Sequence, residues 1–291
     1  MEHLIVEWAP LPGRAPIAEV LPPVSSRLVT RRIIHAAGPE VDAVNAACGR
    51  TFHECAAKNV GVRRAAGAYV VLTNQDIIFL PELAAAVRDW IMSGLSRTTF
   101  ARCDRLDISV AEDEAYPVVD RVEEAIRRRH AIHARGASTF CSGSPLRTLF
   151  AAATRPAPDY ELPEKSLLLP WSSSTGGRGL HTNASGDFLL VAKTSLIEAG
   201  SLAEGFPWRS HLDSLSIFRL WGLGLGQVIF RMPAIAVHVD HGRNEPASPE
   251  WHVVEPYVDG LLQGDPYPGQ PAYWGLADSS FDETEARWKR C

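Results

Sequence analysis

The sequence predicts an α/β fold, and two observations carry that prediction. Strand-like and helix-like stretches alternate through residues 1–110, which is typical of sheets whose strands are joined through helices. The strand-like stretch Ala68–Asn74 is apolar for most of its length, as in a strand that is covered on both faces. We therefore expect a sandwich with a mainly parallel central sheet that is flanked by helices.

The N-terminal elements follow from short apolar stretches that are separated by turn residues. His3–Trp8 is predicted to form a strand, because its apolar run soon reaches a Pro-Gly turn. Ile17–Leu21 suits a short helix, and Arg27–Ala36 contains the next strand. Phe52–Ala66 is predicted to be helical, with apolar and basic side chains on different faces and Gly67 at the position of a C-cap.

The same patterning continues beyond the apolar strand. Pro81 is expected to open a helix, because the apolar residues that follow it recur at helical spacing. After residue 180, strand-like and helix-like stretches resume. They are a strand, two helices and two further strands, at Asp187–Lys193, Thr194–Gly200, Ser210–Gly222, Gln227–Met232 and Ala234–His241.

These changes in pattern divide the chain. Residues 111–180 combine one predicted helix, Asp120–Ala134, with a polar stretch rich in Pro and Ser, and we expect a helical and loop insertion that serves as a lid. Periodicity is weak after residue 243, where an irregular tail is expected. The predicted organisation is an α/β half, the insertion, a second half of the same domain and the tail, at 1–110, 111–180, 181–243 and 244–291.

Composition and charge argue against several classes of protein. Hydrophobic residues make up 46% of the chain and charged residues 22%, and the net charge of −5 offers no bulk attraction to nucleic acid. No apolar stretch approaches the ~18 residues of a membrane span, and no signal peptide opens the sequence. The five cysteines contain no C-x-x-C pair. We expect a cytoplasmic protein with no transmembrane segment and no nucleic-acid partner.

Two acidic residues stand at the ends of predicted strands. Glu7 lies near the end of His3–Trp8, and Asp76 follows the apolar strand in the sequence TNQD. In open α/β sheets, ligands bind beyond the carboxyl ends of the strands, so both acids are candidates for a functional site. The structural alternatives are a turn-forming role for Asp76 and a capping role for Glu7.

Three stretches in order along the chain resemble the GT-A glycosyltransferases, in particular family 2-like members. The first, AAKNVGVRRAAGAYVVLTNQDIIF, looks like the family's helix, hydrophobic strand and Asp-x-Asp site. The second, SGDFLLVAKTSLIEAGSLAEGF, is similar to a family strand and the helix that follows it. The third, WRSHLDSLSIFRLWGLG, sits where the family places a Glu-Asp motif. The resemblance spans about Leu4–Arg243, and a bacterial group carrying IVEW, AKNVGVRRA, HTNASGDF and HLDS looks similar as well.

The resemblance implies a Rossmann-like nucleotide-diphospho-sugar transferase fold and a UDP- or GDP-sugar as donor. Mg or Mn is the expected cofactor, held by Asp76 and by His238 or His241, because hard cations prefer oxygen ligands and a cation neutralises the leaving diphosphate. Residues 1–110 would form the donor-binding half. Its expected donor-binding residues are Glu7, Lys58, Asn59, Arg63, Asn74 and Asp76.

Residues 181–243 would form the acceptor-side half, which binds a small molecule or a glycan. An inverting transferase needs a base that takes the proton of the attacking hydroxyl, and Asp213 is the candidate. An aromatic side chain on this side would stack on a sugar ring. The expected acceptor-binding residues are Asp187, His181, Trp208 and His211.

Several features leave alternatives open. Asn74 replaces the first Asp of Asp-x-Asp. The chain begins almost at IVEW, so we expect that either the family's usual first strand–helix unit is absent or the chain is a truncated form. Both departures favour a catalytically inactive GT-A-like binding or partner protein as the alternative function, while a nucleotidyltransferase would need a Gly-rich loop that the sequence lacks. Asp213 also suits a helix cap paired with Ser210, and His238 also suits a structural histidine.

Overall fold

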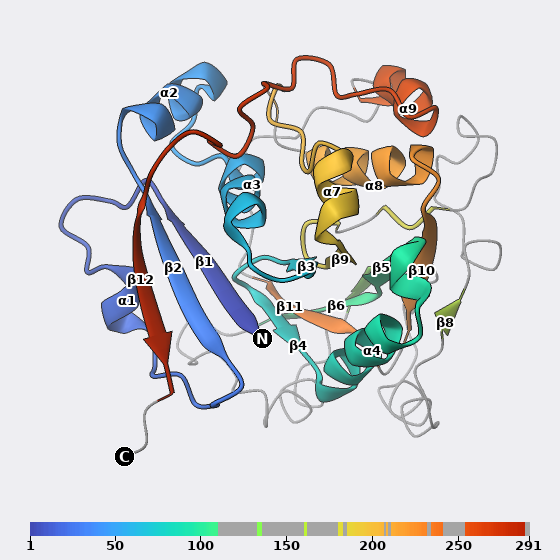
Figure 1. Ribbon diagram of the computed structural model, residues 1–291, viewed down its shortest axis with the longest axis horizontal. Helices are drawn as coiled ribbons and strands as arrows, with labels where there is room; N and C mark the ends of the chain where they lie inside the picture. Colours follow the sequence, from blue (N-terminus) through green and yellow to red (C-terminus); the bar gives the residue numbers. More distant parts are fainter. Residues whose placement is uncertain are drawn as a thin grey trace.

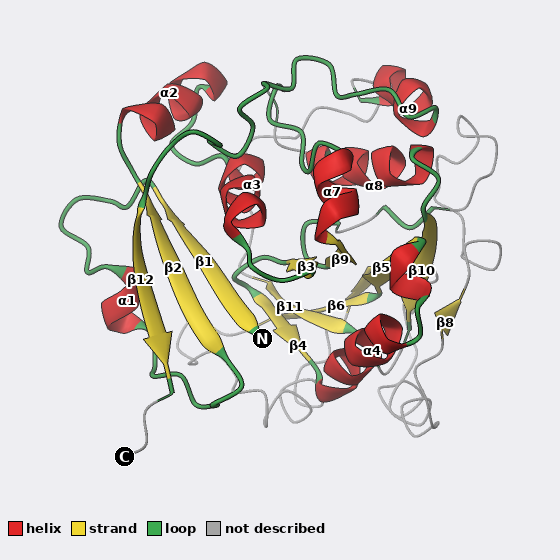
Figure 2. Cartoon of the chain, in the orientation of Figure 1, coloured by secondary structure: helices red, strands yellow, loops and turns green. Residues whose placement is uncertain are grey.

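The computed structural model of the chain is a mixed α/β fold in which helices pack on several sheets (Figures 1 and 2). It describes residues 1–109, 133–135, 160–161, 180–182, 185–206, 208, 211–231, 234–240 and 254–288. Within these ranges, no helix has the length and apolar character needed to cross a membrane.

Strands and helices alternate through the first part of the chain, as predicted. The elements up to residue 109 are β1 (Glu2–Trp8), α1 (Ile17–Val20), β2 (Thr30–Ala36), α2 (Pro39–Cys48), α3 (Glu54–Arg64), β3 (Tyr69–Leu72), β4 (Ile77–Phe79), α4 (Pro81–Met92), η1 (Leu95–Arg97), β5 (Thr99–Cys103) and β6 (Arg105–Ser109). The predicted strands and helices of this part are confirmed with small shifts at their ends. The patterning missed α2, β4, η1, β5 and β6.

The second part of the chain adds the remaining strands and helices. They are β7 (His133–Arg135), β8 (Tyr160–Glu161), β9 (Leu189–Ala192), α7 (Lys193–Glu198), α8 (Leu212–Gly222), β10 (Gly226–Phe230), β11 (Ala236–Asp240), α9 (Glu255–Leu262) and β12 (Asp282–Arg287). The elements predicted after residue 180 are confirmed. Most of the predicted insertion lies outside the described residues, and the predicted helix Asp120–Ala134 is wrong at its end, where β7 begins.

The prediction of a mainly parallel central sheet is wrong, because the five-stranded sheet is mixed. Its strand order is β3-β9-β5-β10-β8. β5 and β10 are parallel, but β9 pairs antiparallel with β3 and β5, and β8 pairs antiparallel with β10. Parallel pairing is favoured where one crossover helix joins neighbouring strands. β9 instead enters after the long segment that follows β6, so no short crossover sets its direction.

Two smaller sheets complete the fold. One has the order β4-β11-β6-β7, in which β11 pairs antiparallel with β4 and parallel with β6. The other has the order β1-β2-β12, and Figure 1 shows it to one side of the five-stranded sheet. In this sheet β1 and β2 are parallel, whereas β12 is antiparallel to β2. The C-terminal strand therefore pairs with a strand from the start of the chain.

The predicted irregular C-terminal tail is wrong at α9 and β12. Val258, Leu261 and Leu262 on α9 are buried, so this helix contributes to the core. β12 has the sequence DETEAR and is almost entirely exposed, as is common for an edge strand that carries charges. A strand without apolar alternation gives no periodic signal, which explains why the patterning missed it.

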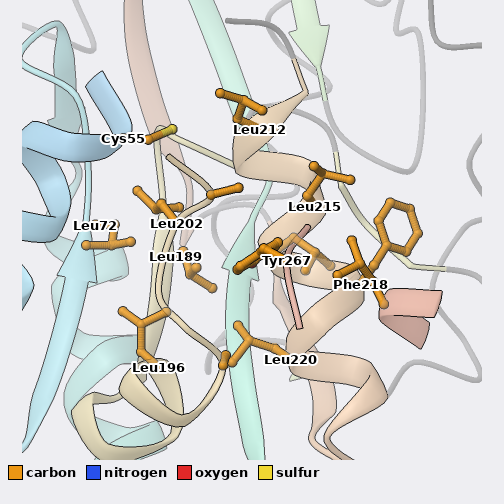
Figure 3. Close-up of a cluster of buried hydrophobic side chains, with 14 of the residues drawn as sticks. Cys55, Leu72, Leu189, Leu196, Leu202, Leu212, Leu215, Phe218, Leu220 and Tyr267 are labelled. Atoms are coloured by element: carbon orange, nitrogen blue, oxygen red, sulfur yellow. The ribbon is translucent and has the colours of Figure 1, made fainter. Parts of the chain in front are cut away.

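The largest core cluster joins α3, the five-stranded sheet, α7, α8, α9 and the segment after α9. Figure 3 shows part of it, with Cys55 from α3, Leu189 from β9, and Leu212 and Leu215 from α8. Leu212 and Leu215 lie in the first turns of α8, and both are buried. This packing fixes the starts of α3, β9 and α8 relative to one another. Polar residues beside these three points are therefore held in a common frame.

Gly222 allows α8 to pack closely on the C-terminal end of α9. A Cβ at this position would lie 2.0 Å from the backbone oxygen of Leu261, which is too close for any side chain. We expect Gly222→Ala to lower the free energy of unfolding by about 1–3 kcal/mol, measured by urea denaturation. Gly61→Ala is the matched control, because a Cβ there would meet side-chain atoms of Leu4 and Val6 and not backbone. Equal losses in the two variants would contradict this account.

Candidate functional site

A cluster of charged and amide side chains surrounds Gly186, where several elements come close together. Its members come from α3, the turn after β3, the start of β6, the residues before β9 and the first turn of α8. We call it the Gly186 cluster. Its residues are Glu54, Lys58, Asn74, Arg105, Gly186, Asp187 and Asp213.

Lys58 is at the centre of the Gly186 cluster, and its side chain is only 12% exposed. Its Nζ donates to Glu54 Oε1 at 2.6 Å, to Asn74 Oδ1 at 2.5 Å and to the backbone oxygen of Gly186 at 2.8 Å. An ammonium group has three hydrogen-bond donors, so these contacts use its full capacity. Lys58 therefore ties α3 to the turn after β3 and to the residues before β9.

Asn74 connects Lys58 to Asp187. Its Oδ1 accepts from Lys58, and its Nδ2 donates to Asp187 Oδ1 at 2.8 Å. The second oxygen of Asp187 forms an ion pair with Arg105, and both of these charged residues are buried. A buried ion pair is stable only when the remaining polar atoms are also hydrogen-bonded. Asn74 provides one such bond to Asp187.

Asp213 lies in the first turn of α8 and reaches the same cluster. Its Oδ2 accepts from the backbone N–H of Gly186 at 2.7 Å, and its Oδ1 accepts from the N–H of Ser214 at 2.9 Å. Burial, and then the nearby charge of Glu54, raise the pKa of the Asp213 carboxyl above its ordinary value. A carboxylate with a raised pKa at a polar cluster suits a general base, and the bond to Ser214 also satisfies the helix start.

Gly186 lets these charged groups converge. A Cβ at this position would lie 3.1 Å from Glu54 Oε1, 3.2 Å from Lys58 Nζ and 3.5 Å from Asp213 Oδ2. Any larger residue would compete for the space that the three groups share. The glycine therefore allows the backbone oxygen and the N–H of residue 186 to contact Lys58 and Asp213.

Asp76 lies next to His238, where β4 begins beside β11. Asp76 is buried, and its Oδ2 lies 3.3 Å from His238 Nε2. The backbone explains this proximity, because Ile77 is paired with His238 and the N–H of Val239 donates to the oxygen of Asp76. Among the described residues, no group of three or more His, Cys, Asp or Glu is arranged to hold a metal. The pair offers one carboxylate and one imidazole, which are both donors that Mn accepts.

The predicted acceptor-side residues other than Asp187 lie in different surroundings. His181 is fully buried, its Nε2 lies 3.5 Å from Asp104 Oδ1, and burial lowers its pKa. Trp208 packs against Phe206, with ring centroids 4.7 Å apart. His211 is the N-cap residue of α8, with a left-handed φ of 66°. His241, the predicted alternative to His238 as a cation ligand, lies outside the described residues.

The other predicted donor-binding residues make internal contacts away from the Gly186 cluster. Glu7 accepts from the N–H of Ile17 at 2.8 Å and lies 2.7 Å from His35 Nδ1. Arg63 stacks on the ring of Trp274, at 3.7 Å from its centroid. Asn59 is fully buried and bonds to both the N–H and the oxygen of Leu202.

Sequence reasoning missed three members of the Gly186 cluster, namely Glu54, Arg105 and Gly186. A signal existed for Glu54, which stands four residues before Lys58, the spacing of an ion pair on a helix. Gly186 is part of the SGDF motif, but the residue predicted from that motif is its neighbour Asp187. Arg105 has no motif around it, because its role depends on a partner 82 residues away in the chain.

Neither of two comparisons with known proteins assigns the chain to a family. A scan against models of protein families and a search of curated proteins both find no match. The Gly186 cluster can hold a carboxylate base in a fixed position, and the pair of Asp76 and His238 can provide ligands to a cation.

Proposed function

We propose that the chain is a GT-A-type glycosyltransferase that moves a sugar from a UDP- or GDP-sugar to a hydroxyl group of a small molecule or a glycan, with inversion. One observation supports this most strongly. Asn74, Asp187 and Asp213 come from the three separate stretches that resemble the family, and all three belong to the Gly186 cluster. Separate motifs that meet at one polar site favour a functional role over a chance likeness.

The residues of the site suit distinct roles in such a transfer. Asp213 would accept the proton of the acceptor hydroxyl. Burial raises the pKa of its carboxyl, which makes the carboxylate a stronger base. Asp187 would line the acceptor side. Asp76 and His238 would hold Mg or Mn together with phosphate oxygens of the donor, and the cation would supply positive charge to the leaving diphosphate.

The proposed function is tested by hydrolysis of UDP- and GDP-sugars in the presence of Mn. The wild-type chain is expected to release nucleoside diphosphate, and Asp76→Ala is expected to lower this rate by about 10²-fold or more, because the cation loses its carboxylate ligand. Asp89→Ala is the matched control, because the Asp89 side chain lies on α4 and is 42% exposed. An unchanged rate of hydrolysis in Asp76→Ala would show that the cation binds elsewhere.

The second candidate is a catalytically inactive relative that binds a nucleotide-sugar. The contacts of Asn74 favour it, because an amide occupies the place of a family carboxylate and bonds to Lys58 and Asp187. Binding of a nucleoside diphosphate without release of product from any sugar donor would support this candidate. Turnover would exclude it.

A further inference from the structure

Asn74 stands where the family pattern has a carboxylate, but its neighbours require an amide. Lys58 can only donate hydrogen bonds, and Asp187, which is paired with Arg105, can only accept them as a carboxylate. A side chain between them must accept at one end and donate at the other. The amide group of Asn74 does both, and the two partners together fix its orientation.

A carboxylate at residue 74 would satisfy only one of these neighbours. It could accept from Lys58, but it would bring a second negative oxygen against Asp187 Oδ1, which lies 2.8 Å from Asn74 Nδ2. Like charges at such a distance repel each other strongly in a buried site. Glu54 and Asp213 already contribute negative charge around Lys58, so the cation has little capacity to compensate another carboxylate.

We propose that Lys58 and Asn74 are positioning residues for Asp187. Lys58 is held by Glu54 and by the oxygen of Gly186, Asn74 is held by Lys58, and Asp187 is held between Asn74 and Arg105. The departure from Asp-x-Asp is therefore part of a working site. The inference rests on the proposed transferase function, in which Asp187 lines the acceptor side.

An exchange of the side chains at residues 74 and 187 directly tests the hydrogen bond between Asn74 and Asp187, which we call the bridge. Asn74→Asp and Asp187→Asn are each expected to lower the Tm by roughly 5 °C or more, because each leaves one hydrogen-bond partner unmatched. The double variant carries Asp at 74 and Asn at 187, so Lys58 and Arg105 keep their acceptors and the amide donates in the opposite direction. It should recover most of the lost Tm. Additive losses, or a stable Asn74→Asp variant, would overturn the proposal.

A control variant separates the effect of losing the bridge from the effect of adding a negative charge. Gln263→Glu makes the same change of charge at an exposed position and should leave the Tm nearly unchanged. Lys58→Met should lower the Tm, and in that background the loss of Tm caused by Asp187→Asn should shrink, because Asn74 can then turn its oxygen toward the new amide. An undiminished loss for Asp187→Asn in the Lys58→Met background would contradict the role of Lys58.

Donor hydrolysis provides a readout that a purely structural role would not change. At a temperature where every variant is folded, Asn74→Asp should lower kcat for a UDP- or GDP-sugar with Mn while KM for the donor changes little, because Asp76 and His238 are untouched. A lower KM or a higher kcat would show that a carboxylate at residue 74 serves as a cation ligand, and it would overturn the proposal. If neither the wild-type chain nor any variant hydrolyses a donor, the proposed function fails. The Tm values of the variants at residues 74 and 187 still test the hydrogen bond between Asn74 and Asp187.

Discussion

Replacing Asp213 with Asn is expected to lower the rate of sugar transfer or donor hydrolysis by about 10²–10⁴-fold, because the amide cannot accept the proton of the attacking group. Asp213 lies at the start of a well-packed helix, and its neighbours Leu212 and Leu215 anchor that helix in the core. Nucleotide affinity should therefore change little, and calorimetry on the same variant checks it. Unchanged activity in Asp213→Asn would show that Asp213 is not the base and acts only as a helix cap.

The pH dependence of kcat/KM provides an independent check on Asp213. Burial and the charge of Glu54 raise the pKa of this carboxyl, whereas the Gly186 N–H, Lys58 and Arg102 lower it. A base acts when it is deprotonated, so activity should fall as the pH decreases through the raised pKa. Glu54→Gln removes the like charge and should move this acidic limb to lower pH. A limb that stays in place, or that moves to higher pH, would argue against Asp213 as the base.

Replacing Asn59 with Leu is expected to lower the free energy of unfolding by about 3 kcal/mol, with little effect on nucleotide affinity. The fully buried amide bonds to Leu202 N–H at 3.0 Å, to Leu202 O at 2.8 Å and to Glu204 Oε1 at 2.6 Å. Leucine has a similar volume but leaves these partners unmatched in a dry environment, which costs more than the bonds themselves contribute. Urea denaturation measures the loss.

Glu204→Gln is the matched control for Asn59→Leu. Glutamine keeps an oxygen that can accept from Asn59 and from the N–H of Gly275, so its loss at neutral pH should stay below about 1 kcal/mol. Burial raises the pKa of Glu204, so the wild-type chain loses stability as the pH rises through that pKa. Glu204→Gln should lack this loss. A small cost for Asn59→Leu combined with weaker nucleotide binding would instead restore Asn59 as a donor-binding residue.

The elements that the sequence predicted are those that carry a local signal. Pro81 and the apolar spacing after it define α4, and the apolar run Tyr69–Leu72 defines β3. The direction of β9 could not be predicted, because it depends on how a long intervening segment returns to the sheet. β12 could not be predicted either, because its stability comes from backbone pairing with β2 and not from buried side chains.

The residues of the candidate site also divide into those with a local sequence signal and those without one. Asn74, Asp187 and Asp213 were found through the motifs around them, and their convergence follows from the packing of α3, β9 and α8. Asn59 and Arg63 share the first motif with Lys58, but the rotation of α3 directs them to Leu202 and Trp274. Spacing along a helix does not tell which face meets the site until the neighbouring elements are known. Arg105 depends on a contact across the fold and has no sequence signal.

Titration calorimetry with nucleoside diphosphates, with and without Mn, tests the proposed transferase most directly. Our account predicts that UDP or GDP binds, that Mn strengthens the binding and that Asp76→Ala removes the effect of Mn, because the cation is shared between Asp76 and the phosphates. Asp89→Ala should behave as the wild type. The account would be contradicted if no nucleoside diphosphate binds in the presence of Mn, or if Mn strengthens binding equally in Asp76→Ala.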